Sequence, residues 1–503
     1  MRSKKAIKNI LVSLLLQFVT IICGFIVPRM IIESFGSNVN GLISSITQFL
    51  GYITLLESGF GPVVKATLYK PIAQKDKKQI ANILKSSEKF FKTIAIIFLI
   101  YIVILSGLYP ILLVNEFDKI FTISLVLIIA ISTFAEYYFG MTYRLYLQAE
   151  QKTYVVSGIQ IITTILNTIS VVVLIKLGTN IQLVKLFSSL IFVFRPIAQN
   201  LYVKRVYNIN LNEANNDFKI EQKWDGLAQH IAAVVHNNTD IAILTFLSNM
   251  AEVSVYSVYL LVVTGVKKVV SSFTGGIDAS FGDMLARKEY ENLNKKFRLY
   301  ETFYFTIITI IFTCTFILIV PFVTIYTNGI QDVNYIRPLF AVLLVLAEFT
   351  HSIRLPYSSL VLSAGHFKET RIGAWVEAGV NIILSIILVF KFGIIGVAIG
   401  TFVAMFIRTV EFMIHSSKKI LNRSVWCCIK RVLIVIGQVL FVVFIVNIIN
   451  IKIEMVSYLN WFIYAVIVFI ISSVIVILGN SIGYKSDFKE AINVLKMVKN
   501  KEH

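Results

Sequence analysis

The chain has 503 residues, of which 57% are hydrophobic and only 15% are charged, and its formal net charge is +19. Soluble globular domains carry about a quarter charged residues. A water-soluble chain of this length would also divide into two or three domains joined by polar linkers, and we find no such linker. The composition therefore excludes an ordinary soluble protein.

The positive charge does not indicate a nucleic-acid partner, because of where the basic residues lie. They fall in short segments between long apolar runs. This distribution is typical of the positive-inside bias that anchors the cytoplasmic loops of membrane proteins. We expect membrane lipids as partners and no nucleic acid.

Apolar runs of about 20 residues recur along the chain, and each can cross a hydrocarbon core of ~30 Å as a helix. Only helices or closed barrels satisfy every backbone polar group in lipid, and runs this long exclude barrel strands. We therefore predict an all-α polytopic membrane protein with about fourteen transmembrane helices. The predicted spans are 9–31, 42–66, 90–114, 120–146, 154–176, 181–205, 226–248, 252–280, 302–326, 336–362, 371–391, 394–416, 427–449 and 459–480.

The distribution of Lys and Arg predicts the orientation of these spans. Segments 1–8 and 67–92 carry eleven basic residues together, whereas the predicted outer loops and the span-end residues that adjoin them carry four, Lys119, Lys176, Lys391 and Lys452. Basic loops remain on the cytoplasmic side of a membrane. We therefore expect a multi-pass membrane protein with both termini in the cytoplasm.

An internal repeat predicts the architecture. Residues 73–76 (Ala-x-Lys-Asp) recur at 286–289 as Ala-x-Lys-Glu, and residues 176–178 (Lys-Leu-Gly) recur at 391–393 as Lys-Phe-Gly. The spacing between matched positions is nearly constant over most of the repeat, so the first twelve helices form two six-helix copies in the same orientation. Parallel repeats place a substrate path between the halves and suit alternating access.

The repeat also predicts the domain organisation. It gives two pseudo-symmetric six-helix lobes, a cytoplasmic linker, two additional C-terminal helices and a cytoplasmic tail. These parts are residues 1–205 (N-lobe), 206–225 (linker), 226–420 (C-lobe), 421–483 (helices 13 and 14) and 484–503 (tail).

Ionisable side chains at membrane depth are the best indication of a functional site. Each costs at least ~2.5–3.5 kcal/mol at a helix centre, so such a side chain usually faces a cavity or a partner. The mid-span set is Glu57, Glu136, Arg195, His236, Asp240, Lys267, Lys268, Glu348, His351 and Arg354, and four residues lie nearer the span ends: Arg29, Lys65, Arg144 and Arg408.

Helical spacing groups some of these residues. Glu348, His351 and Arg354 lie at i, i+3 and i+6, within one arc of a helix. They form either an internal salt-bridge cluster or a cavity face on which Arg354 binds an anion. His236 and Asp240, at i and i+4, either couple transport to protonation or include a purely structural histidine.

The cationic members of the set favour an anionic substrate. Arg195, Lys267, Lys268 and Arg354 would give a cavity a positive potential inside low-dielectric walls. Lys267 and Lys268 are adjacent and point ~100° apart, so at most one faces a given cavity directly. Arginine suits phosphate through two parallel hydrogen bonds, and lysine acts as a point charge, so a phosphate or diphosphate is expected.

Motifs for an enzyme are missing from the sequence. It contains no phosphate-binding loop, no spacing of zinc ligands and no nucleophile elbow. We therefore predict a transporter without catalytic residues, metal or cofactor. Uphill work would then come from an ion gradient, with Glu57, Glu136, His236, Asp240, Glu348 and His351 as the coupling candidates.

One segment carries a family resemblance. Residues 28–29 (Pro-Arg), 35–42 (Phe-Gly-Ser-Asn-Val-Asn-Gly-Leu) and 55–61 (Leu-Leu-Glu-Ser-Gly-Phe-Gly), followed by 68–71 (Leu-Tyr-Lys-Pro), resemble the start of bacterial polysaccharide flippases. These are the Wzx-type repeat-unit exporters of the multidrug/oligosaccharidyl-lipid/polysaccharide (MOP) exporter superfamily. Topology and duplication extend the resemblance over essentially the whole chain, but its specific part is mostly residues 24–80.

The resemblance implies a V-shaped bundle that moves an undecaprenyl-diphosphate-linked oligosaccharide from the inner to the outer leaflet. It also implies partners in capsule or exopolysaccharide synthesis, such as a glycan polymerase and a chain-length regulator. Related lipid flippases use cationic residues on helices 1, 2 and 8, which would correspond by helix to Arg29, Lys65 and Lys267 or Lys268.

Two other functions stay open. A cation-coupled multidrug exporter or antiporter of the same superfamily would use the acidic residues of the mid-span set. A membrane glycan polymerase or glycosyltransferase would need catalytic residues on sizeable loops, which the predicted topology lacks.

Overall fold

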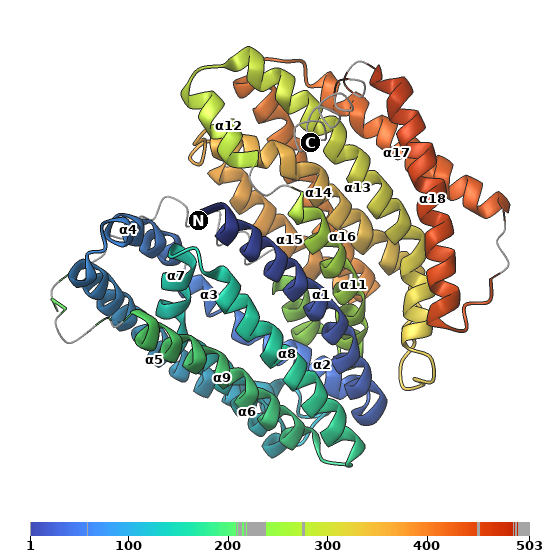
Figure 1. The fold of residues 1–503 in the computed structure, drawn as a ribbon. Coiled ribbons are helices and arrows are strands. Elements are labelled where there is room, and N and C mark those ends of the chain that lie inside the picture. Colours follow the sequence, from blue (N-terminus) through green and yellow to red (C-terminus); the bar gives the residue numbers. More distant parts are fainter. Residues whose placement is uncertain are drawn as a thin grey trace. The chain divides into compact units, whose positions relative to one another are not determined.

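The structure is a computed structural model, and it describes residues 2–57, 59–207, 238–273, 277–449 and 453–485, with a few isolated positions between 208 and 237 and between 486 and 490. Every regular element in these ranges is a helix, which confirms the predicted all-α class (Figure 1). The chain divides into two compact units, Met1–Ser257 and Val258–His503. The predicted boundary at 206–225 falls almost wholly outside the described residues and stays a prediction.

The first unit is a bundle in which α1 packs on α8, α8 and α6 pack on α9, and α5 packs on α6 (Figure 1). A short apolar helix, Asn238–Leu247, and the first turns of α11 (Met250–Ser272) complete it. Its other helices are α1 (Arg2–Phe35), α2 (Ser37–Gly51), α3 (Thr54–Glu57), α4 (Phe60–Gln74), α5 (Lys77–Leu112), α6 (Lys119–Ala135), the π-helix η1 (Glu136–Gly140), α7 (Met141–Ala149), α8 (Thr153–Lys176) and α9 (Ile181–Tyr207).

The second unit contains the rest of α11 and the helices that follow it. Here α14 and α15 both pack on α16, while α13 packs on α14 and α18. Its helices are α12 (Ile277–Ala286), α13 (Tyr290–Tyr326), α14 (Pro338–Ser363), α15 (Arg371–Phe392), α16 (Ile394–His415), the π-helix η3 (Ser416–Ile420), α17 (Trp426–Ile449) and α18 (Tyr458–Gly483).

Thirteen of the helical segments in the described residues are long and apolar enough to cross a membrane. The predicted span 226–248 is described only over the helix Asn238–Leu247. The predicted span 42–66 is not one helix, because the chain breaks after α2 and again before α4. Gly59 lies at the second break with φ of 75°, a left-handed conformation that glycine adopts without steric cost.

The predicted repeat has a counterpart in the backbone. Lys75 has φ of 57° between α4 and α5, and Lys288, the matching lysine of the second copy, has φ of 59° between α12 and α13. In both units this sharp turn precedes a helix of similar length, 36 residues in α5 and 37 in α13. The two copies therefore share local geometry at positions where a left-handed residue is uncommon for any side chain but glycine.

Two glycines allow α15 and α16 to pack closely. Gly396 and Gly400 form a Gly-x-x-x-Gly pattern on α16, an arrangement that lets membrane helices approach backbone to backbone. A Cβ atom added to Gly396 would lie 2.3 Å from the carbonyl oxygen of Leu388 on α15. The sequence contained this pattern, but only the structure identifies its partner helix.

We predict that Gly396→Ala destabilises the second unit by about 1–3 kcal/mol, because the new methyl group forces the two backbones apart. A lower midpoint of thermal unfolding in detergent would show it. Gly379→Ala on α15 is the matched control, since its Cβ would meet nothing within 4 Å. An equal midpoint in the two variants would contradict the close approach.

Candidate functional site

A polar cavity of about 430 Å³ lies inside the first unit, at the level where two of its helices are irregular. The break between α2 and α4 and the π-helical turn η1 both contribute to its wall. Backbone irregularity at membrane depth is tolerated where it lines a cavity, and π-turns are frequent at functional sites. The lining residues are Thr47, Leu50, Gly51, Ile53, Thr54, Glu57, Ser132, Thr133, Glu136, Tyr137, Met141, Arg144, Gln160, Phe192 and Arg195.

Arg195 of α9 enters this cavity with only hydroxyl groups as hydrogen-bond partners. Its Nε donates to Thr163 Oγ1 at 2.6 Å, and one terminal nitrogen donates to Thr164 Oγ1 at 2.8 Å. Its guanidinium carbon lies 4.2 Å from the centre of the Phe192 ring. Within the described ranges, Arg195 has no carboxylate at ion-pairing distance.

The two carboxylates of the cavity already have partners. Glu136 forms an ion pair of 2.9 Å with Arg144, one element further along the chain. Glu57 accepts a hydrogen bond of 3.2 Å from the Tyr137 hydroxyl. Because Arg144 takes up the charge of Glu136, the cavity presents Arg195 as a cation whose charge is not cancelled by direct contact.

In the second unit the corresponding arginine, Arg408, has carboxylate partners instead of hydroxyl partners. Arg408 follows Arg195 at the same spacing that separates the paired lysines Lys75 and Lys288, and its Nε faces Glu377 Oε2 at 3.5 Å. A terminal nitrogen of Arg408 also contacts Glu411 at 2.5 Å.

The partner of each arginine comes from a matching part of the repeat. At the spacing that separates the two arginines, Glu377 matches Thr164, the neighbour of Thr163, and both threonines accept hydrogen bonds from Arg195. A carboxylate in one copy therefore occupies the place that a hydroxyl occupies in the other.

Arg354 also contacts Glu377, which belongs to a neighbouring helix. A terminal nitrogen of Arg354 lies 2.6 Å from Glu377 Oε1, and both side chains are buried. The arrangement is a closed salt bridge between α14 and α15, not a cluster of Arg354 with Glu348 and His351. Burial at this depth requires such a partner.

Glu348 and His351 belong to a separate group with α11. Lys267 Nζ lies 3.4 Å from Glu348 Oε1, and His351 Nδ1 lies 3.8 Å from the other carboxylate oxygen. Of the predicted Lys267–Lys268 pair, only Lys267 makes this ion pair, in keeping with the ~100° between adjacent helical side chains. The group joins one carboxylate to two groups that can carry positive charge.

The remaining predicted residues lie apart from the cavity lining. Arg29 is 3.6 Å from Glu33 on α1, and Lys65 is half-buried on α4. Asp240 is buried and accepts a hydrogen bond of 2.6 Å from the Tyr256 hydroxyl. Its predicted neighbour, His236, lies outside the described residues.

Sequence reasoning omitted Thr163 and Glu377, the two residues that distinguish the units. Glu377 is an ionisable residue inside the predicted span 371–391, and this alone would have placed it in the mid-span set. Thr163 carries no comparable signal, because threonine is common in membrane helices. Only its position opposite Arg195 gives it a role.

We predict that Arg354→Gln lowers the midpoint of thermal unfolding by removing one partner from a buried ion pair. The cost is about 3 kcal/mol, at the low end of the usual range because Arg408 still faces Glu377. The double variant Arg354→Gln/Glu377→Gln should recover part of the loss. An unchanged midpoint in the single variant would contradict a stabilising role for this ion pair.

Comparisons with known proteins identify the fold. No family model and no curated protein matches the sequence. Among solved structures, the lipid II flippase MurJ in an inward closed conformation aligns with a TM-score of 0.68 over 95% of this chain and 99% of that chain, at 17% identity.

Two further solved structures with this fold are MATE transporters. A eukaryotic MATE transporter, AtDTX14, aligns with a TM-score of 0.55 over 82% of this chain and 95% of that one, at 13% identity. An inward-facing multidrug resistance MATE family transporter of the MOP superfamily gives 0.53 over 80% and 94%, at 15% identity. The chain therefore has the fold of MOP-superfamily transporters and flippases, and the neighbours that define this fold are not enzymes.

Proposed function

We propose that the protein is a flippase of the bacterial cell membrane that carries an undecaprenyl-diphosphate-linked oligosaccharide repeat unit from the inner to the outer leaflet. It works by alternating access and is driven by an ion gradient. In this proposal it belongs to the Wzx-type exporters of capsule or exopolysaccharide synthesis. The fold supports a transporter, and the substrate is inferred from the chemistry of the cavity.

The proposal depends on one observation, that Arg195 has hydroxyl partners and no carboxylate partner among the described residues. A guanidinium held at membrane depth without a carboxylate is unfavourable unless a ligand or water supplies acceptors. Thr163 and Thr164 fix two of its nitrogens and leave its charge in place. A phosphate oxygen is the acceptor that this charge favours.

The rest of the cavity suits the sugar part of such a substrate. Thr47, Thr54, Ser132, Thr133 and Gln160 add hydroxyl and amide groups that both donate and accept hydrogen bonds. Glu57 and Glu136 can accept from sugar hydroxyls, and aromatic rings line the same wall. A pocket with a few convergent polar groups among apolar ones is typical of a small-molecule site.

An apolar cleft in the second unit supports a lipid substrate. It has a volume of about 510 Å³ and lies between α13, α14, α17 and α18. Its wall includes Phe316, Phe349 and Leu440, and almost all of its other lining side chains are apolar. Such a cleft provides an apolar surface on which part of a polyprenyl chain can pack in place of bilayer lipid, through van der Waals contacts.

The group around Glu348 is the proposed site of ion coupling. Glu348 lies 3.4 Å from Lys267 and 3.8 Å from His351, so a proton gained or lost by this group would change its ion pairing. We propose that the ion gradient acts on transport through this change.

A cation exporter is the second candidate, and one observation favours it. Glu57 and Glu136 line the same cavity as Arg195, so the cavity contains acidic as well as basic groups. If Glu57 and Glu136 bind the cargo, their neutralisation should abolish transport while Arg195 is dispensable.

We predict that Arg195→Gln prevents rescue of a flippase-null strain, scored by surface polysaccharide and by accumulation of the lipid-linked intermediate. Loss of one charge-assisted contact with phosphate, ~1.5–3 kcal/mol, corresponds to about 10- to 100-fold weaker function. Arg205→Gln is the matched control, because Arg205 lies exposed in the last turn of the same helix. Normal display by the Arg195 variant at wild-type abundance would refute the anionic-substrate proposal.

We predict that Thr163→Glu inactivates the protein without unfolding it, because it gives Arg195 the partner that Glu377 gives Arg408. Export should fall at least tenfold, since the new carboxylate competes with the phosphate for one guanidinium. Thr163→Gln has the same size without the charge and should retain most of the export. Similar export by the Glu and Gln variants would show that the charge of Arg195 is not used.

A further inference from the structure

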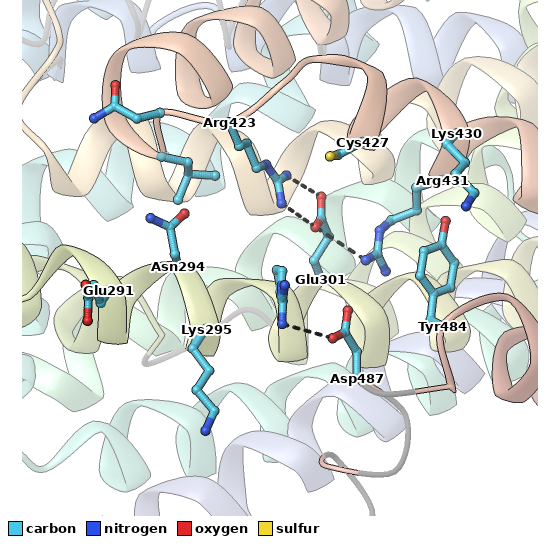
Figure 2. Close-up of a pocket in the computed structure, with 13 residues that line it drawn as sticks. Glu291, Asn294, Lys295, Glu301, Arg423, Cys427, Lys430, Arg431, Tyr484 and Asp487 are labelled. Atoms are coloured by element: carbon cyan, nitrogen blue, oxygen red, sulfur yellow. Dashed lines mark hydrogen bonds and ion pairs between the residues drawn. The ribbon is translucent and has the colours of Figure 1, made fainter.

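A second cavity, of about 710 Å³, lies in the second unit where three helices end (Figure 2). The first part of α13, the first turns of α17 and the end of α18 form its wall. These parts belong to the face of the protein that the Lys and Arg distribution predicts to be cytoplasmic. The cavity shares no residue with the one around Arg195.

At the centre of this cavity one carboxylate serves two arginines (Figure 2). Glu301 accepts two hydrogen bonds from Arg423, at 2.8 and 3.0 Å, and lies 3.5 Å from Arg431. Burial opposes the charged form of Arg423, but the charge and hydrogen bonds of Glu301 outweigh it and raise the pKa of Arg423 above its ordinary value. Arginine side chains stay protonated in proteins, so one negative charge faces two positive ones.

The other acidic residues around the cavity do not remove this surplus. Asp487 forms an ion pair of 3.3 Å with Arg298, and Lys295 forms one of 2.7 Å with Glu490. Within each of these two ion pairs the opposite charges neutralise each other. Glu291 and Lys430 also line the cavity, and their opposite charges cancel in the sum. The two arginines at Glu301 therefore leave one positive charge in excess.

Two buried hydrogen-bond donors at the cavity have no acceptor. The Tyr484 hydroxyl and Arg423 Nε are both buried, and neither has a partner among the described residues. A buried donor without an acceptor costs about 1–3 kcal/mol, so a ligand or water is expected to supply one. Arg431 lies 4.2 Å above the Tyr484 ring, which holds the two side chains together beside Glu301.

Excess positive charge together with unused donors calls for a ligand rich in acceptor oxygens. A phosphate group has this character and binds arginine and lysine well. The site lies where the apolar part of α17 begins and that of α18 ends. Of the 18 most apolar consecutive residues of each helix, only 22% in α17 and 17% in α18 are buried within the protein. Lipid therefore covers most of their surface, and lipid phosphates lie at the depth of the helix ends.

From this geometry we infer that the cavity binds the phosphate group of a membrane lipid in the leaflet predicted to be cytoplasmic. Arg431 and Lys430 supply the charge, and Tyr484 donates a hydrogen bond. The phosphate could belong to a bulk anionic phospholipid or to a polyprenyl diphosphate carrier. Basic pockets between membrane helices on the cytoplasmic side are a known mode of headgroup binding.

The test compares lipid binding by the full chain in detergent with that of the variant Lys430→Gln/Tyr484→Phe, which leaves both arginines and Glu301 intact. The probes are short-chain phosphatidylglycerol, phosphatidylcholine, undecaprenyl diphosphate and inorganic diphosphate. We expect at least one of the two anionic lipids to bind about fivefold more weakly to the variant, as one surface lysine contributes ~1 kcal/mol. Lys418→Gln, an exposed lysine outside the cavity, is the matched control.

Loss confined to phosphatidylglycerol would assign the site to bulk phospholipid, and loss confined to undecaprenyl diphosphate would assign it to the carrier. Equal weakening by Lys418→Gln, no weakening at all, or inorganic diphosphate binding as tightly as the lipids would overturn the inference. Arg195→Gln should leave binding at this cavity unchanged. If that variant fails to export but still binds lipid here, the lipid-phosphate site is tested independently of the proposed export function.

Discussion

The cost of placing a charge in hydrocarbon governs the polar structure of this protein. Water cannot solvate a guanidinium or carboxylate at membrane depth, so each one needs a partner or a polar cavity. The second unit meets this need with shared carboxylates. At membrane depth Glu377 lies between Arg354 and Arg408, and nearer the helix ends Glu301 lies between Arg423 and Arg431.

The first unit meets the same need in another way. Its corresponding arginine, Arg195, is held by threonine hydroxyls beside a polar cavity, and its charge remains available. The duplicated copies thus share a scaffold, as the matching left-handed turns at Lys75 and Lys288 indicate, but differ in charge balance. Duplication preserves backbone geometry because packing constrains it, whereas one polar side chain can change with little effect on the fold.

Several residues with similar sequence signals have different roles in the structure. Arg195 and Arg354 are both mid-span arginines, yet one lines a cavity and the other closes a salt bridge with Glu377. Spacing along one helix places Glu348, His351 and Arg354 on a common arc, but that arc is wide enough to meet more than one neighbour. Glu348 contacts Lys267 on α11, while Arg354 contacts α15.

The sequence by itself determined the membrane class, the helical character, most of the spans and the repeat, because hydropathy and local spacing are properties of single segments. It did not predict the breaks around Glu57 or the π-turn at Glu136, which form where neighbouring helices and a cavity replace regular backbone hydrogen bonds. Only the tertiary structure decided which charges are neutralised. Ion pairing depends on side chains such as Thr163 and Glu377 that approach an arginine from another helix, and no pattern along one helix specifies that approach.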